Sequence, residues 1–305
     1  YIARSSMMWI VVPPVKHASL EDAICDFTSW RRRGWCRMEF AASKLCAGED
    51  MPLMVVNSPT APPEYFNPCD IFKLCASRGD FTVDSDRDAV NETLTKMLKA
   101  KVEAYGKEDI TVARLLQVFS PLFVPREAYY GASGGLDHLK SFLKWRSDEE
   151  AWMAETGWNL LMFAAAMDDE QAVDELLSQD AATVKRLLEA KGTDMVIPGN
   201  GKGPKLRREP LGQKLLQYSV NMTPLIAAMT FASRAVCEKL LDAGAPVERD
   251  GLALLCDRPC TFKGAVIAGK HENVNLLLDR YPQYANAIHP DAGGCPLHFA
   301  AMTSQ

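Results

Sequence analysis

Residues 221–245, NMTPLIAAMTFASRAVCEKLLDAGA, contain the pattern that decides the predicted fold. Thr223 stands at a turn, and small alanine residues follow it. Cys237, Leu240 and Leu241 then recur at the i, i+3 and i+4 spacing of an apolar stripe along a helix. The stretch therefore predicts two short helices, with small residues that allow the pair to pack closely.

The same pattern recurs elsewhere in the second half of the chain. Copies run over 157–178 and 260–280, and a further copy starts at 294 and is cut short. The turn residue, a small residue and the leucine pair keep the same offsets in the three longer copies: Asn159, Ala164 and Leu176/Leu177; Thr223, Ala228 and Leu240/Leu241; Cys260, Ala265 and Leu277/Leu278. A unit of this size cannot bury its apolar stripe alone, so we expect neighbouring units to stack.

TPLIAAM at Thr223 and CPLHFAA at Cys295 resemble the ankyrin repeat, whose signature is T-P-L-H-x-A-A, a helical turn and then V-x-x-L-L. GAPVE from Gly244 is similar to the family's turn after its second helix. The resemblance implies an all-α ankyrin solenoid over residues 156–305. It also implies a protein partner bound through the concave surface, where the exposed turns and first helices include Asn159, Met222 and Gly294.

Some features depart from the family pattern. The first copy has NLLM at Asn159 where the family has TPLH, so we expect it to be an edge unit. Residues 191–218 interrupt the array and are rich in Gly, Pro, Lys and Arg, which predicts an exposed loop. This loop could be a basic interaction segment or a neutral insertion, and its GNGKGPK stretch lacks the spacing of a phosphate-binding loop. His298 holds the family's histidine position, which implies a local bond and no chemistry.

Residues 1–105 predict an α/β part with a parallel sheet flanked by helices. MMWIVVPPV from Met7 and MPLMVVNS from Met51 are continuous apolar runs, as expected for strands buried on both faces. Helices are predicted over 29–46 and 87–105. Residues 106–155 predict a helical connector that caps the repeats, in which His138 and Trp145 are packing residues.

Glu39 lies in the predicted helix over 29–46, within WRRRGWCRMEF. At 3.6 residues per turn it falls at the rim of the apolar face that contains Trp35. Two interpretations remain open from spacing alone. Glu39 is either a boundary residue that pairs with Arg32 or an acid at the mouth of a pocket.

Trp35, Cys36, Glu39 and Phe40 resemble the W-C-x-x-E-L motif on a helix of plant-type TIR (Toll/interleukin-1 receptor) domains. The resemblance covers roughly residues 1–105 and implies that Glu39 is the catalytic acid of an NAD-cleaving enzyme, where it would stabilise positive charge on the ribose as nicotinamide leaves. The family's first strands would lie before Tyr1, so we interpret the chain as a piece of a longer protein with an incomplete TIR-like domain that is inactive alone. A non-catalytic, flavodoxin-like scaffold is the further alternative.

Composition narrows the function classes. The net charge of -5 predicts no nucleic-acid partner, and no apolar run is long enough to span a membrane. Nine scattered cysteines indicate reduced thiols, a cytoplasmic location and no metal site. The sequence therefore predicts a protein–protein interaction scaffold with a TIR-like signalling domain and no cofactor. The alternative is an NAD-cleaving signalling enzyme regulated by the ankyrin array, with NAD as its substrate.

Overall fold

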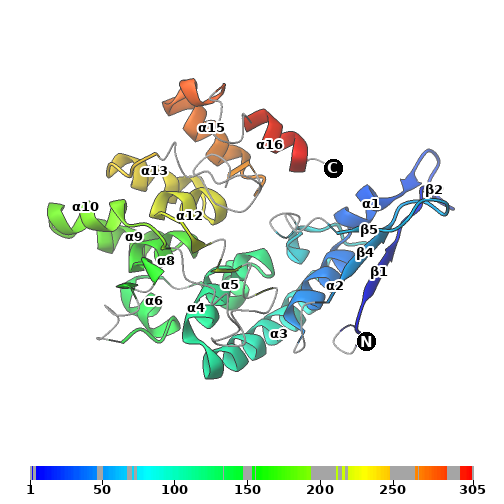
Figure 1. The fold of residues 1–305 in the computed structure, drawn as a ribbon, viewed down its shortest axis with the longest axis horizontal. Coiled ribbons are helices and arrows are strands. Elements are labelled where there is room, and N and C mark those ends of the chain that lie inside the picture. The colour runs from blue at the N-terminus through cyan, green and yellow to red at the C-terminus, as the bar shows by residue number, and fades with distance from the viewer. Residues whose placement is uncertain are drawn as a thin grey trace.

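The structure is a computed structural model and is mostly helical, with a small mixed sheet (Figure 1). It describes residues 2, 5–46, 51–66, 71, 74–132, 134–146, 153–154, 156–193, 211, 215–216, 219–247, 265–266, 268–286 and 296–303. Cys260, Gly294, Cys295 and most of the predicted loop over 191–218 lie outside the described residues.

The sheet contains three strands in the order β1-β4-β5. β1 (Met8–Val11) and β4 (Leu53–Val56) are parallel, whereas β5 (Glu64–Tyr65) is antiparallel to β4. The predicted parallel sheet is thus correct for one strand pair only. The short Pro-rich link between β4 and β5 explains the difference, because a parallel crossover needs a dozen or more residues. A second, two-stranded sheet pairs β2 (Val15–Lys16) with β3 (Ile24–Cys25).

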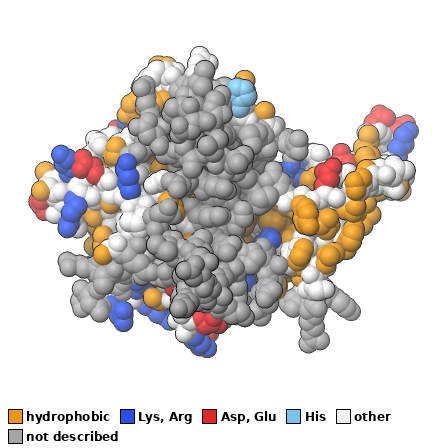
Figure 2. Space-filling view, viewed as in Figure 1, with side chains coloured by type: hydrophobic (Ala, Val, Ile, Leu, Met, Phe, Trp, Pro, Cys, Tyr) orange, Lys and Arg blue, Asp and Glu red, His pale blue; other side chains and the backbone are white. Residues whose placement is uncertain are grey.

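Only one face of the three-stranded sheet is buried, so the prediction of strands buried on both faces was wrong. Ile10, Leu53 and Val55 pack with Phe40 of helix α2 (Gly34–Leu45) in one apolar cluster. Strand side chains alternate between faces, and Trp9 on the other face is 53% exposed. Figure 2 shows the hydrophobic side chains gathered on this part of the surface. The large apolar residues exposed on these small strands are Trp9, Val11, Val15, Ile24 and Tyr65.

The helix predicted over 29–46 is two helices, α1 (Phe27–Arg32) and α2. Arg33 is extended between them, and the flanking backbone bonds to a distant segment instead. The Gly34 amide donates to the Asp80 carbonyl at 2.8 Å, and the Asp80 amide donates to the Arg32 carbonyl at 2.7 Å. The Phe81 ring covers Gly34 so closely that a Cβ atom would not fit there. The break therefore depends on a tertiary contact.

Further helices connect this part to the second half of the chain. They are η3 (Ala76–Arg78), α3 (Asp86–Glu108), α4 (Ile110–Val118), η4 (Ser120–Leu122), α5 (Arg126–Tyr129) and α6 (Leu136–Phe142). In Figure 1, α3, α4 and α5 lie between the sheet and the helices of the second half. Every residue of α4 after Ile110 is buried, because α4 has neighbours on all sides.

The second half contains helical hairpins. α8 (Leu160–Ala166) pairs with α9 (Glu170–Leu177), and α12 (Pro224–Phe231) pairs with α13 (Arg234–Asp242). Asn159 and Thr223 are the N-caps of the first helices, where their side-chain oxygens accept from the amides of Met162 and Ile226. The remaining elements are α10 (Ala181–Glu189), α15 (His271–Arg280), η6 (Pro282–Tyr284) and α16 (Pro296–Thr303).

Polar contacts join each hairpin to the next. Asp168, in the α8–α9 turn, accepts from both the amide and the hydroxyl of Ser233 in the α12–α13 turn, each at 2.8 Å. Asn273 of α15 is buried and donates to the carbonyls of Met229 and Ala232 at 3.3 and 3.1 Å. The two hairpin turns therefore lie side by side, and α15 packs against the end of α12.

The first helices of the hairpins are buried on all sides. In α12 every residue is buried, and in α8 every residue after Leu160 is buried. Phe119, at the end of α4, contacts Phe231 with ring centroids 5.2 Å apart. A single apolar cluster extends from α2 through α4 to α15. The connector thus covers part of α8, through α6 and Trp145, and the end of α12, through Phe119.

One expectation from the sequence was wrong. Asn159 and Met222 were predicted at exposed turns, yet each is only 1% exposed. Asn159 uses its side chain to cap α8 and to donate to the Leu187 carbonyl at 2.9 Å. Neither residue presents a free surface to a protein partner.

Asp169 joins the connector to the first hairpin. Its buried carboxylate accepts from the Tyr130 hydroxyl at 2.6 Å, from the Gly135 amide at 3.0 Å and from the Ala172 amide at 3.0 Å. Nearby, His138 bonds the Tyr130 carbonyl at 3.0 Å, which fits its predicted packing role. One side chain therefore caps α9 and fixes the segment between α5 and α6.

We expect Asp169→Ala to lower the free energy of unfolding by about 2–4 kcal/mol, because it removes a helix cap and charge-assisted bonds to buried donors. Asp174→Ala is the matched control on the same helix, since its carboxylate is exposed and pairs with Lys239 at 2.6 Å. The control should lose less than about 1 kcal/mol. Urea denaturation followed by circular dichroism measures both, and equal losses would contradict this role for Asp169.

Candidate functional site

Glu39 is exposed on α2 and does not pair with Arg32. Arg32 instead lies 3.3 Å from Asp80, with both side chains mostly exposed. The predicted Arg32–Glu39 pair fails because the break at Arg33 places the two residues on different helices.

The other three residues of the predicted motif around Glu39 are divided between surface and core. Trp35 is 45% exposed, and its indole donates to the Asp86 carboxylate at 3.0 Å. Cys36 is half-buried, and this burial raises the pKa of its thiol. Phe40 is buried and stacks on Phe66 with ring centroids 4.9 Å apart. The structure therefore gathers the motif on one helix, with Phe40 alone in the sheet's core.

The carboxyl group of Glu39 is partly shielded from water, and this desolvation raises its pKa above the ordinary value. The nearby Arg33 guanidinium acts in the opposite direction with a smaller effect. A carboxyl with a raised pKa suits proton transfer, but partial desolvation beside the apolar face of α2 is sufficient to cause the shift.

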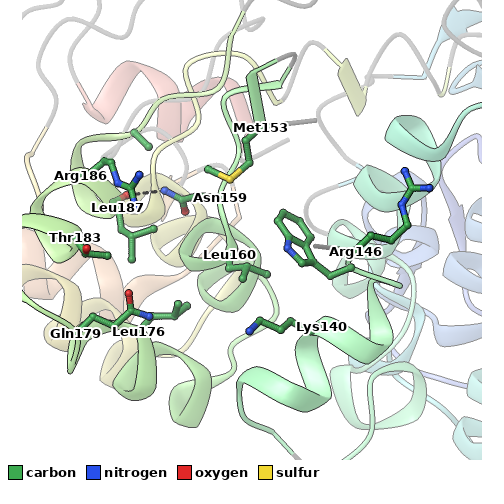
Figure 3. Close-up of a pocket in the computed structure, with 12 residues that line it drawn as sticks. Lys140, Arg146, Met153, Asn159, Leu160, Leu176, Gln179, Thr183, Arg186 and Leu187 are labelled. Atoms are coloured by element: carbon green, nitrogen blue, oxygen red, sulfur yellow. Dashed lines mark hydrogen bonds between the residues drawn. The ribbon is translucent and has the colours of Figure 1, made fainter. Parts of the chain in front are cut away.

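A groove of about 600 Å³ lies elsewhere, where the connector meets the first hairpin (Figure 3). Its walls come from α6, from the segment after it, from the start of α8, from the end of α9 and from α10. The described lining residues are Lys140, Trp145, Arg146, Met153, Asn159, Leu160, Leu176, Gln179, Thr183, Arg186, Leu187 and Ala190.

The described lining combines positive charge with apolar surface. Lys140, Arg146 and Arg186 supply three cations, and the lining residues that the structure describes include no carboxylate. Neither Lys140 nor Arg186 forms an ion pair with another residue that the structure describes. Figure 3 shows these two side chains on opposite sides of the groove, with Leu160 between them.

Buried polar contacts hold the connector wall in place. Arg114 is 2% exposed and donates from Nε to the Leu143 carbonyl at 3.1 Å and from Nη2 to the Lys144 carbonyl at 3.0 Å. Its guanidinium also lies 5.3 Å from the centre of the Trp145 ring, which packs edge-on against Phe163. Trp145 is thus a packing residue, as the sequence predicted, and also lines the groove.

The α10 wall is fixed separately. Asp180 caps α10 by accepting from the amides of Ala182 and Thr183 at 3.1 and 3.0 Å. The bond from Asn159 to the Leu187 carbonyl then joins α10 to the start of α8. Sequence reasoning missed α10, although Asp180 followed by AATVKRLLE combines a helix cap with good helix formers.

The groove is suited to binding an anion that carries an apolar group.

No group of His, Cys, Asp and Glu residues able to hold a metal ion occurs in the part of the chain that the structure describes. Among the described helices, none is long and apolar enough to cross a membrane.

No protein-family model matches the chain, and comparisons with curated proteins and with solved structures found no match.

Glu39 provides a pH-dependent prediction. Since the pKa of Glu39 is raised on folding, the folded protein binds this proton more readily than the unfolded chain does. The free energy of unfolding therefore falls as the pH rises from the pKa of the unfolded chain to that of the folded protein. Glu39→Gln should therefore unfold at the same temperature as the parent, or a slightly higher one, near neutral pH. The difference should disappear once the pH falls below the usual titration range of glutamate.

Thermal unfolding over a pH series measures this effect, with Glu103→Gln on α3 as an exposed control whose carboxylate pairs with Lys107. A Glu39→Gln variant that is clearly less stable than the parent at neutral pH would show that the charged carboxylate has a stabilising partner.

Proposed function

We propose that the protein is an interaction protein whose residues 156–305 form an ankyrin-type array and bind another protein. The single observation that carries this proposal is the register of the hairpins. The α8–α9 turn bonds to the α12–α13 turn, where Ser233 donates to Asp168, and Asn273 of α15 donates to the Ala232 carbonyl at the end of α12. The repeated sequence pattern and these contacts together support an array of stacked units.

Exposed ion pairs on the second helices fit the same arrangement. Lys239 of α13 lies 2.6 Å from Asp174 of α9, and Arg280 of α15 lies 2.6 Å from Asp242 of α13. Such exposed pairs contribute little stability each, but they mark the outer helices as neighbours. Since the inner helices are buried, we infer that a partner binds the outer helices or the ends of the array.

The first half then acts as a scaffold that covers the inner helices, and the TIR-like relationship remains a proposal based on four residues of one helix. The NAD-cleaving alternative places catalysis at Glu39, which is exposed and lies on a different part of the chain from the groove. The scattered cysteines favour a reducing compartment such as the cytoplasm. The five described cysteines are all free thiols.

Site-specific photo-crosslinking in cells that normally contain the protein tests the interaction. A photoreactive phenylalanine derivative replaces one exposed residue at a time: Gln179, Ala235 or Asn275 on the array, and Lys99 on α3 as the control. We expect a discrete protein adduct from at least one array position and none from Lys99. Absence of adducts at all three array positions, or the same adducts at Lys99, would contradict the proposal.

An NAD-consumption assay separates the enzymatic alternative from the scaffold. We expect no turnover by the protein, and Glu39→Ala should fold normally, because the residue is exposed. NAD loss with release of nicotinamide that disappears in Glu39→Ala would instead identify an NAD-cleaving enzyme.

A further inference from the structure

We propose that the groove between α6, α8 and α10 docks an acidic segment of the partner protein, with an apolar side chain inserted between carboxylates. The inference rests on the proposed function and names the place and chemistry of the contact. The inner helices are buried, so the partner would bind instead at the end of the array that meets the connector.

Charge is the first argument. The chain as a whole carries a net charge of -5, whereas the described lining of the groove holds the cations of Lys140, Arg146 and Arg186 and no carboxylate. The cations of Lys140 and Arg186 have no ion-pair partner within the described chain, and they stand on opposite walls. Each can therefore donate to a different carboxylate of one ligand. Arginine suits this role because its guanidinium binds a carboxylate through two parallel bonds.

Apolar surface is the second argument. Leu160, Leu176 and Leu187 line the groove between the charged walls, together with Met153. The volume of about 600 Å³ lies within the range of sites that enclose drug-sized ligands. An aliphatic or aromatic side chain placed there would be removed from water while its acidic neighbours contact Lys140 and Arg186. A nucleic acid fits less well, since it presents a continuous row of phosphates and few apolar groups.

Preorganisation is the third argument. Arg114 fixes the backbone that leads to Trp145, and Asn159 fixes α10 through the Leu187 carbonyl. Both of these side chains are almost completely buried. Because the walls are held by buried bonds, a ligand does not have to order them on binding, and more of the interaction energy appears as affinity.

Fluorescence anisotropy with labelled peptides tests the inference. The probes are short peptides in which one leucine, phenylalanine or methionine is flanked on each side by two Asp or Glu residues. Matched probes replace the acids by Asn and Gln, or the apolar residue by Ser. We expect binding of the acidic probes that weakens as salt is raised, and clearly weaker binding of both matched sets.

Two adjacent residues of α10 give a matched pair of variants. Both residues are exposed, but only Arg186 lines the groove, whereas Lys185 lies 3.9 Å from Glu189 on the same helix. Arg186→Gln and Lys185→Gln each remove one positive charge and keep a good helix former. We expect Arg186→Gln to weaken peptide binding about three- to tenfold, as for a partly desolvated charged bond, and Lys185→Gln less than about twofold. Lys140→Gln should weaken binding from the opposite wall.

Several results would overturn the inference. One is that no acidic probe binds protein that circular dichroism shows to be folded. Another is that Arg186→Gln and Lys185→Gln weaken binding equally. A third is that probes with Ser in place of the apolar residue bind as tightly as the acidic probes that contain it. If octanoate displaced the peptide and bound with the same affinity, the groove would instead be assigned to a small amphipathic anion. Adducts at Ala235 or Asn275 without any peptide binding would leave the proposed function standing and reject this docking site alone.

Discussion

The burial of α8 and α12 is the constraint on which the rest of the structure depends. Both helices are apolar around their whole circumference, so α9 and α13 can cover only part of each. A helix with this composition must be buried on every side. The two helices cover each other, and the connector adds to this cover through α6, which packs on α8, and through Phe119, which contacts Phe231. Asp169 then fixes the connector in the position that this cover requires.

Local signals in the sequence were sufficient to predict the hairpin helices α8, α9, α12 and α13, but not their surroundings. Asn159 and Thr223 were predicted as turn residues, and both are helix N-caps. Such a cap could be predicted because its side-chain oxygen bonds an amide only three residues further along the chain. The exposure of Asn159 could not be predicted in the same way. It depends on covering segments far away in the sequence, and no local pattern encodes those contacts.

The first half and the groove also depend on contacts between residues far apart in the sequence, which local patterns do not predict. Apolar runs predicted β1 and β4, but the break at Arg33 arises from backbone bonds to Asp80. That tertiary contact separates Arg32 from Glu39 and removes the expected ion pair. The groove combines cations from different elements, such as Lys140 and Arg186, with apolar residues of α8 and α9. Each of these residues has an ordinary local environment in sequence, and only the fold brings them together.

The cover over the inner helices also bears on how such a chain can change during evolution. Repeat arrays usually gain and lose units easily, because each unit contacts only its neighbours. Here Phe119 and Phe231 belong to different halves and share one interface, so a change of volume at one must be matched at the other. The two halves are therefore expected to be inherited together and not exchanged as separate modules.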